Sequence, residues 1–179
     1  SYGTAAAQAL CDYHIRNGGL SRYHKFDWFL ADYLGRPKAV EGERQQLLNN
    51  YANAVWEGML SCEMDTALIR LREQTPHARW VVASGGDSRE LREIFRRRAL
   101  DTFFDGGIFG SPDTKDEIFA RFAQESNTFR PALFLGDSHY DASAARHADI
   151  DFVFVTHWSD VQPPDDVVCA NDLSDFLIV

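Results

Sequence analysis

The sequence is poor in cysteine, and its three cysteines form no recognisable pattern. Cys11, Cys62 and Cys169 are far apart and odd in number. They lack the paired spacing of a zinc site or of a redox motif. We therefore expect a protein of a reducing compartment.

Long apolar runs are also missing from the chain. No stretch approaches the roughly 18 apolar residues needed to cross a bilayer. The first residues show no basic region followed by a hydrophobic segment. These absences predict a soluble, cytoplasmic protein without a membrane partner.

Positive charge is scarce. The chain has 18 basic and 27 acidic residues, which gives a formal charge of -9 at pH 7. Such a charge disfavours binding to nucleic acid backbones and to anionic membrane surfaces. The only basic run, residues 96–98, lies near the end of an expected helix, where the helix dipole favours cations. We therefore expect no nucleic acid partner, and the sequence gives no signal on oligomeric state.

The chain does have enough apolar residues for a sizeable core. Of its 179 residues, 45% are hydrophobic, which suits one ordinary domain or a core with a modest insertion. In the first seventy-odd residues the apolar side chains recur at helical spacing. Helices are expected over residues 4–17, 21–34, 41–58 and 64–72.

The pattern changes at Arg79, where β-rich runs begin to alternate with amphipathic stretches. Strands are expected over residues 80–83, 103–109, 132–135 and 151–155 and, more weakly, 167–169; helices are expected over 88–99, 115–124 and 141–148 and at the C-terminus. This alternation is typical of an α/β fold with a parallel sheet covered on both faces. We therefore expect a helical domain over residues 1–77 and an α/β core over residues 78–179.

The stretch over residues 131–145 organises the expected core. It reads Pro-Ala-Leu-Phe-Leu-Gly-Asp-Ser-His-Tyr-Asp-Ala-Ser-Ala-Ala, so Asp137 stands where a strand ends and Asp141 opens the next helix. Ligands of open α/β sheets bind beyond the carboxyl ends of the strands. Two acids four residues apart also suit Mg²⁺, which prefers oxygen ligands. The alternative is that Asp141 merely caps its helix.

Two further strand ends are expected to present polar groups to the same crevice. Ser84, followed by Gly85, comes after the apolar run 80–83, and Lys115 begins the helix that follows the next strand. A serine in this position also suits a helix cap. Lys115 opposes the helix dipole, whose N-terminal end favours acids. Its presence there points to an anionic ligand.

Three short motifs of the core resemble a known family. Ala-Ser-Gly-Gly-Asp, Gly-Ser-Pro-Asp-Thr-Lys and Leu-Gly-Asp-Ser-x-x-Asp-Ala-x-Ala-Ala occur in this order within residues 79–155. They resemble the second, third and fourth motifs of the haloacid dehalogenase (HAD) superfamily, specifically of its magnesium-dependent phosphatases. The resemblance implies a three-layer, Rossmann-like parallel sheet with a helical (C1-type) cap. It also implies hydrolysis of a small phosphorylated metabolite through an aspartyl-phosphate intermediate.

The resemblance implies a role for each crevice residue. Ser84 and Gly85 would bind the transferring phosphoryl group, and Lys115 would steady its charge. Asp137 would ligate Mg²⁺, and Asp141 would complete the metal site. These roles suit phosphoryl transfer, which depends on positioning and on neutralising charge at the phosphoryl oxygens.

The helical domain resembles a cap inserted after the first strand of such a core. Its Gly-Leu-Ser-Arg turn, residues 19–22, is similar to the Gly-x-Ser-Arg turn of capped sugar-phosphate mutases and phosphatases. The resemblance implies that Arg22 contacts the substrate, and a guanidinium group suits a second phosphate or a carboxylate. The alternative is an N-cap serine followed by an exposed arginine.

The first motif of the family is absent. It is an apolar strand that ends in Asp-x-Asp-x-[Thr/Val], supplies the nucleophile and lies between the strands that here end at Ser84 and Asp137. The only such string begins at Asp149 and precedes a strand, so its acids would lie at the wrong edge of the sheet. We therefore expect that the natural protein begins upstream of Ser1. Without that strand, the core would be split and would have two exposed strand edges.

Three other functions remain open at this point. A catalytically inactive, anion-binding module would explain the missing nucleophile directly. A dehalogenase needs no metal, which would leave the paired acids Asp137 and Asp141 unexplained. A phosphomutase would use the same fold but would keep the phosphoryl group from water.

Overall fold

The computed structural model describes residues 2–36, 41–125 and 130–178. The first part of the chain is helical, as expected. Its elements are α1 (Thr4–Arg16), α2 (Arg22–Trp28), a π-helical turn (Phe29–Tyr33) that continues α2, α3 (Glu41–Ser61) and α4 (Ala67–Gln74). None of the helices in the described ranges combines the length and the apolar character that a bilayer crossing requires.

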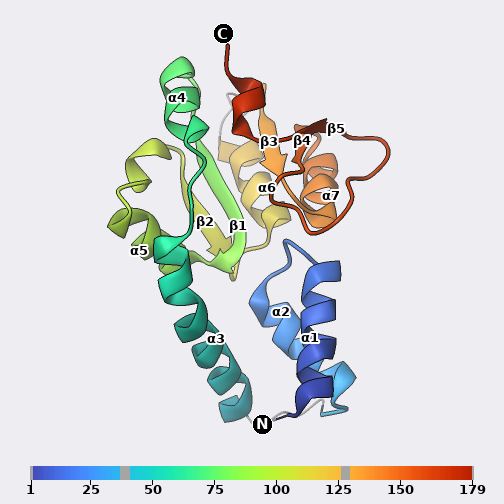
Figure 1. Ribbon diagram of the computed structural model, residues 1–179. Coiled ribbons are helices and arrows are strands. Elements are labelled where there is room, and N and C mark those ends of the chain that lie inside the picture. The colour runs from blue at the N-terminus through green and yellow to red at the C-terminus, as the bar shows by residue number, and fades with distance from the viewer. Residues whose placement is uncertain (1, 37–40, 126–129, 179) are drawn as a thin grey trace.

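Helices α1, α2 and α3 form a unit that projects from the sheets (Figure 1). Its centre contains Ala6, Phe29 and Leu30, which are all at least 94% buried. The helix expected from residue 21 is confirmed, with Ser21 as its N-cap: the Ser21 hydroxyl oxygen accepts a hydrogen bond from the backbone N–H of Tyr23 at 3.1 Å. We refer to α1–α3 as the cap.

Helix α4 does not belong to the cap. It packs against the C-terminal 3₁₀ turn (Leu173–Phe176), and Asp65, just before α4, accepts a hydrogen bond from the backbone N–H of Leu173 at 3.1 Å. Figure 1 shows α4 beside the sheets, at the far end from α1 and α2. The helical unit thus ends between α3 and α4, before the boundary expected near residue 78. The sequence does not show this, because helical periodicity does not reveal what a helix packs against.

The rest of the chain alternates strands and helices. In chain order these are β1 (Val81–Asp87), α5 (Ser88–Arg97), β2 (Gly107–Ser111), α6 (Lys115–Glu125), β3 (Leu133–Gly136), α7 (His139–Ala148), β4 (Asp151–Val155) and β5 (Val168–Ala170). The expectation of a strand over 103–109 was wrong at its start. Residues Asp101–Phe103 form a 3₁₀ turn, and Gly107, where β2 begins, has a φ of +106°. Strand β1 runs further than expected, through Ser84 to Asp87.

The described strands form two parallel sheets and not one. In the first sheet β1 pairs with β2, and in the second β3 pairs with β4 and β4 with β5. Strands β1 and β3 are therefore both edge strands. A cavity of about 340 Å³ lies between them, lined by Ala83 of β1 and by Phe134 and Leu135 of β3. The expected split of the core is thus present, whereas the missing strand itself stays a prediction.

Helix α6 connects the two sheets. Its fully buried Ile118 lies at the centre of the main core cluster. On one side Phe122 meets the ring of Phe109 in β2 at 5.4 Å, and on the other side Phe119 meets Phe134 in β3 at 5.0 Å. Apolar packing by α6 therefore connects two sheets that share no hydrogen bonds among the described residues.

Ile118→Ala tests this role of α6. The substitution leaves a cavity at a position that is 0% exposed, so we expect the free energy of unfolding to fall by about 2–5 kcal/mol in urea titrations. Ile69→Ala is the control, because Ile69 in α4 is 41% exposed and its truncation should cost no more than about 0.5 kcal/mol. Similar losses in both variants would mean that α6 does not hold the sheets together.

Candidate active site

The cavity between β1 and β3 is lined by the core residues that the sequence analysis predicted for the site. Ser84 and Gly85 in β1, Lys115 at the start of α6, Asp137 after β3 and Asp141 in α7 all line it. The structure therefore brings together all the expected core residues, although they span more than fifty positions of the chain. Their roles stay predictions.

A buried ion pair fixes the centre of this site. The Lys115 ammonium and the Asp141 carboxylate are 5% and 4% exposed and contact each other directly. The second carboxylate oxygen of Asp141 accepts hydrogen bonds from the Ser138 hydroxyl at 2.6 Å and from the backbone N–H of Asp137 at 3.3 Å. Asp141 is thus fully occupied by protein partners.

The N-cap of α7 is Ser138 and not Asp141. The Ser138 hydroxyl oxygen accepts a hydrogen bond from the backbone N–H of Asp141 at 3.1 Å. A β-carbon on Gly136 would lie only 2.5 Å from that of Asp141, so a glycine is required where the strand ends. The alternative interpretation of Asp141 as a cap is therefore wrong, because a serine three residues earlier caps the helix and leaves Asp141 for the ion pair.

Asp137 is the carboxylate left available to a ligand. It is exposed at the mouth of the crevice and forms no ion pair among the described residues. Partial desolvation, and then the negative charge of Asp141, raise the pKa of its carboxyl group. A cation or a positively charged ligand would relieve both effects.

These residues fit a magnesium ion only in part. The described residues contain no group of three or more His, Cys, Asp or Glu side chains that could hold a metal. Magnesium does not require such a cage, because it is commonly bound by one or two carboxylates together with waters and substrate phosphates. Asp137 can supply such a carboxylate. Asp141 can act only indirectly, by keeping Lys115 in place.

The end of β1 supplies hydrogen-bond donors. The Ser84 hydroxyl oxygen accepts a hydrogen bond from the backbone N–H of Gly86 at 3.1 Å, and within the described ranges the hydroxyl group donates to no acceptor. The buried Ser111 of β2 donates to the carbonyl of Gly85 at 3.0 Å and so fixes this part of β1. The Ser84 hydroxyl hydrogen can therefore be donated to an anion in the crevice.

The cap closes over the crevice through the turn between α1 and α2. Gly19 in this turn has a φ of +79°, and a β-carbon on it would lie 2.5 Å from the Ser138 hydroxyl oxygen and 3.3 Å from the Lys115 nitrogen. A β-carbon on Gly85 would lie 2.4 Å from the carbonyl oxygen of Gly19. Backbone therefore meets backbone at this contact, which only glycine permits.

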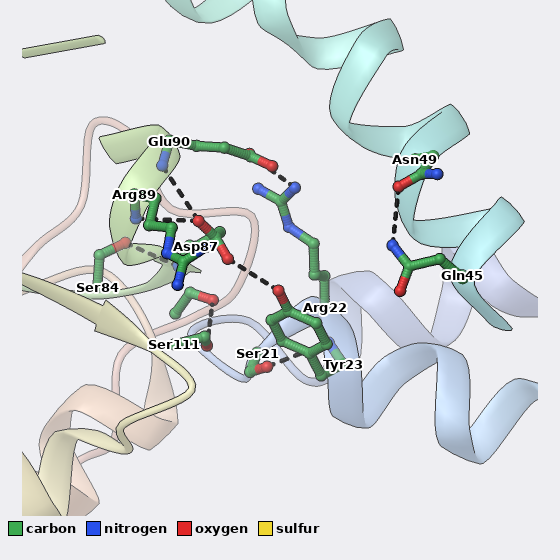
Figure 2. Close-up of polar contacts among 12 residues, drawn as sticks. Ser21, Arg22, Tyr23, Gln45, Asn49, Ser84, Asp87, Arg89, Glu90 and Ser111 are labelled. Atoms are coloured by element: carbon green, nitrogen blue, oxygen red, sulfur yellow. Dashed lines mark hydrogen bonds and ion pairs between the residues drawn. The ribbon is translucent and has the colours of Figure 1, made fainter. Parts of the chain in front are cut away.

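Two side-chain contacts join the cap to the start of α5 (Figure 2). The Tyr23 hydroxyl donates a hydrogen bond to Asp87 at 2.8 Å, and Arg22 forms an ion pair with Glu90 at 2.8 Å. Arg22 is thus paired with the core and is not among the residues that line the cavity, and its expected contact with the substrate stays a prediction. Neither contact was foreseen, because the partners lie more than sixty residues apart in the chain.

Lys25 is the most unusual residue of the cap. It lies in α2, is 5% exposed and contacts His14 of α1, with 3.1 Å between the Lys25 ammonium and the imidazole Nδ1. Burial, and then the positive charge of Lys115, lower its pKa to about 8. Desolvation and the charge of Lys25 also lower the pKa of His14, which keeps the imidazole neutral.

Comparison with solved structures identifies the fold. The chain superposes on a haloacid dehalogenase-like hydrolase from Streptococcus pneumoniae with a TM-score of 0.59 and 17% sequence identity, covering 96% of this chain and 89% of that protein. It superposes on Protein Tyrosine Kinase A from Mycobacterium tuberculosis with a TM-score of 0.61 and 16% identity, covering 96% and 87%. No family model and no curated protein matches the sequence. The expected HAD-like fold is thus confirmed.

Gly85→Ala should keep the cap from closing. The added methyl group meets the backbone of Gly19, which cannot move without displacing the turn, so we expect a loss of about 1–3 kcal/mol and faster amide exchange over residues 17–23. Gly58→Ala is the matched control. Gly58 lies in α3 with nothing near its β-position, and alanine there should add about 0.5–1 kcal/mol without changing exchange in the turn. Unchanged exchange in Gly85→Ala would exclude the closed arrangement.

Lys25→Met should remove a pH-dependent penalty on stability. The pKa of Lys25 is about 8 in the folded protein and 10.5 as its ordinary value, so the penalty is full below pH 8 and is relieved as the pH rises to about 10.5. At pH 7 we expect the methionine variant to be more stable by about 1–3 kcal/mol, and we expect this difference to shrink by pH 10 in urea titrations. A difference that does not depend on pH would show that Lys25 is not desolvated.

Proposed function

We propose that the chain belongs to a magnesium-dependent phosphatase that hydrolyses a small phosphorylated metabolite. The observation that carries the proposal is the meeting of Ser84, the Lys115–Asp141 pair and the available Asp137 in one cavity at the end of β1 and β3. A hydroxyl donor, an ammonium and a free carboxylate for a cation are what a phosphoryl group needs around it.

The nucleophile of the proposed reaction is an aspartate carried on a strand that fills the space between β1 and β3. The cavity between these two edge strands supports this placement. An oxygen of that aspartate attacks phosphorus, and the ester oxygen leaves with a proton from the second aspartate of the Asp-x-Asp motif. Water then gives a proton to that second carboxylate and attacks the acyl phosphate, which releases inorganic phosphate and restores the first aspartate.

In this proposal, the residues that line the cavity position the phosphoryl group for both steps. Ser84 donates its hydroxyl hydrogen to one phosphoryl oxygen, and Lys115, held by Asp141, balances the charge that builds up on the others. Asp137 would hold Mg²⁺, which supplies further charge neutralisation when it is bound. The closed cap excludes water from the first step, and opening of the cap releases the product.

The names of the two matched proteins point to different reactions. One is called a hydrolase and the other a protein tyrosine kinase. Transfer to water and transfer to a hydroxyl group need the same charge neutralisation, so the acceptor is what would distinguish them. We favour water, on the resemblance of the three motifs to those of phosphatases, and we propose a cytoplasmic location on the charge and cysteine content.

The second candidate is an inactive anion-binding module. The specific observation in its favour is that Asp137 is the only carboxylate lining the cavity that is not already paired among the described residues, so these residues supply no separate nucleophile. Such a module would bind phosphate esters without hydrolysing them. An inactive module would have little use for the buried Lys115–Asp141 pair, because apolar residues of similar size often give a protein equal stability.

Asp137→Asn tests the enzymatic proposal in the full-length protein. Hydrolysis of p-nitrophenyl phosphate with Mg²⁺ should fall by at least about a thousandfold, which corresponds to the loss of roughly 4 kcal/mol of transition-state stabilisation. The matched controls are Asp149→Asn and Asp151→Asn, which alter the Asp-x-Asp string that precedes β4.

Both control variants should retain activity, because Asp149 ends α7 and Asp151 begins β4, away from the crevice. Full activity of Asp137→Asn, or activity that survives removal of Mg²⁺ by a chelator, would contradict the proposal.

A further inference from the structure

Trp158, in the loop between β4 and β5, lines the cavity and yet has few protein contacts. It is 49% exposed, although large aromatic side chains are usually well buried. Within the described ranges its indole N–H donates to no acceptor, and its only ring contact is with His157, with 5.9 Å between the ring centroids. Phe134, the other aromatic residue that lines the cavity, already packs against Phe119 and Phe152. The Trp158 ring is therefore available to a ligand.

The register of the second sheet places Trp158 beyond the strand ends. Gly136, the last residue of β3, pairs with Phe154 of β4, so Val155 and the loop that carries Trp158 lie past the end of β3. Strand β3 also separates β4 from the gap between the two sheets. A strand in that gap would pair with β1 and β3 and would be one strand away from β4. Trp158 thus belongs to the part of the cavity where parallel sheets bind their ligands.

Hydrogen bonds on both sides hold the loop of Trp158 in place. The Ser159 hydroxyl donates to the backbone carbonyl of Asp137 at 2.6 Å, which ties the loop to the end of β3. The backbone N–H of His157 donates to the carbonyl of Asn171 at 2.9 Å, just after β5. Both neighbours of Trp158 in the chain are therefore fixed. A ring on a fixed loop costs little further ordering when a ligand binds.

The charged groups of the site and the Trp158 ring line one cavity of about 340 Å³. Lys115 and Asp137 are suited to an oxyanion and its cation, whereas the indole is suited to a flat apolar group. The cap contributes Gly19 to the described lining, and a glycine has no side chain to offer. The apolar contact with a ligand must therefore come from the core side.

We propose that Trp158 determines specificity by stacking on the leaving group of the substrate. The substrate class is a phosphate monoester whose alcohol carries an aromatic or heteroaromatic ring next to the ester oxygen. The ring packs on the indole while the ester group lies at Lys115 and Asp137. This inference rests on the proposed function for hydrolysis, but not for the binding of the ring.

Phenylphosphonate and methylphosphonate are the probes, because they carry the same oxyanion and differ in the ring. In calorimetry on the full-length protein with Mg²⁺, at a pH where both are dianions, phenylphosphonate should bind roughly tenfold more tightly. Trp158→Ala should reduce this preference to less than about twofold and change the methylphosphonate affinity by less than about twofold. Trp158→Phe should keep most of the preference, because an aromatic face remains.

The matched control is Trp56→Ala. Trp56 lies in α3, where its ring contacts Arg97 and does not line the cavity, so this variant should keep the native preference. The inference is overturned if the native protein shows no preference for phenylphosphonate or if Trp158→Ala retains it. Equal losses of affinity for both phosphonates in Trp158→Ala would also overturn it, since the residue would then shape the loop and not contact the ring. Circular dichroism confirms that each variant is folded.

Failure of this inference and failure of the proposed function are distinguishable. Phosphonates are not hydrolysed, so their binding requires no nucleophile. A preference for phenylphosphonate that depends on Trp158, in a full-length protein that hydrolyses no phosphate ester, would keep the inference and contradict the phosphatase. Hydrolysis of p-nitrophenyl phosphate with the native kcat/KM in Trp158→Ala would contradict the inference alone.

Discussion

The ion pair between Lys115 and Asp141 is the interaction on which the rest of the site depends. Lys115 begins α6, whose apolar face connects the two sheets, and Asp141 lies in the first turn of α7, which packs on the second sheet. The pair therefore spans the end of the gap between β1 and β3. Removing one partner from a buried pair costs about 3–5 kcal/mol, since the other charge is left uncompensated. That cost keeps the ammonium at a fixed place in the crevice.

Closure of the cap adds a second constraint at the same place. Gly19 and Gly85 meet backbone to backbone, and Tyr23 and Arg22 bind the start of α5. The polar groups of Tyr23 and Arg22 are thus already paired with core residues and are not available to a ligand in this arrangement. Lys25 is different, because its buried ammonium forms no ion pair with a carboxylate among the described residues and contacts His14 instead.

The sequence predicted what depends on local pattern and failed where distant partners decide. Ser84, Lys115 and Asp137 were found because each follows a strand end or opens a helix, and parallel strands bring such ends to one edge. Arg22 was expected at the substrate because its turn resembles a substrate-binding turn. Its ion pair with Glu90 could not be foreseen, because it joins segments that no periodicity connects. The same limit applies to Lys25, whose burial is visible only once α1 and α2 are packed together. The division of the strands into two sheets followed from the absent motif and not from any residue present.

The central claim is that a strand belongs between β1 and β3 and completes the site. Amide hydrogen exchange of this chain, with and without a synthetic apolar strand peptide that ends in Asp-x-Asp, tests it most directly. The account predicts that the peptide slows exchange at the facing edges, over residues 81–85 and 133–136, and leaves the already paired β4 unchanged. Equal exchange at both edges with and without a saturating concentration of peptide would contradict it.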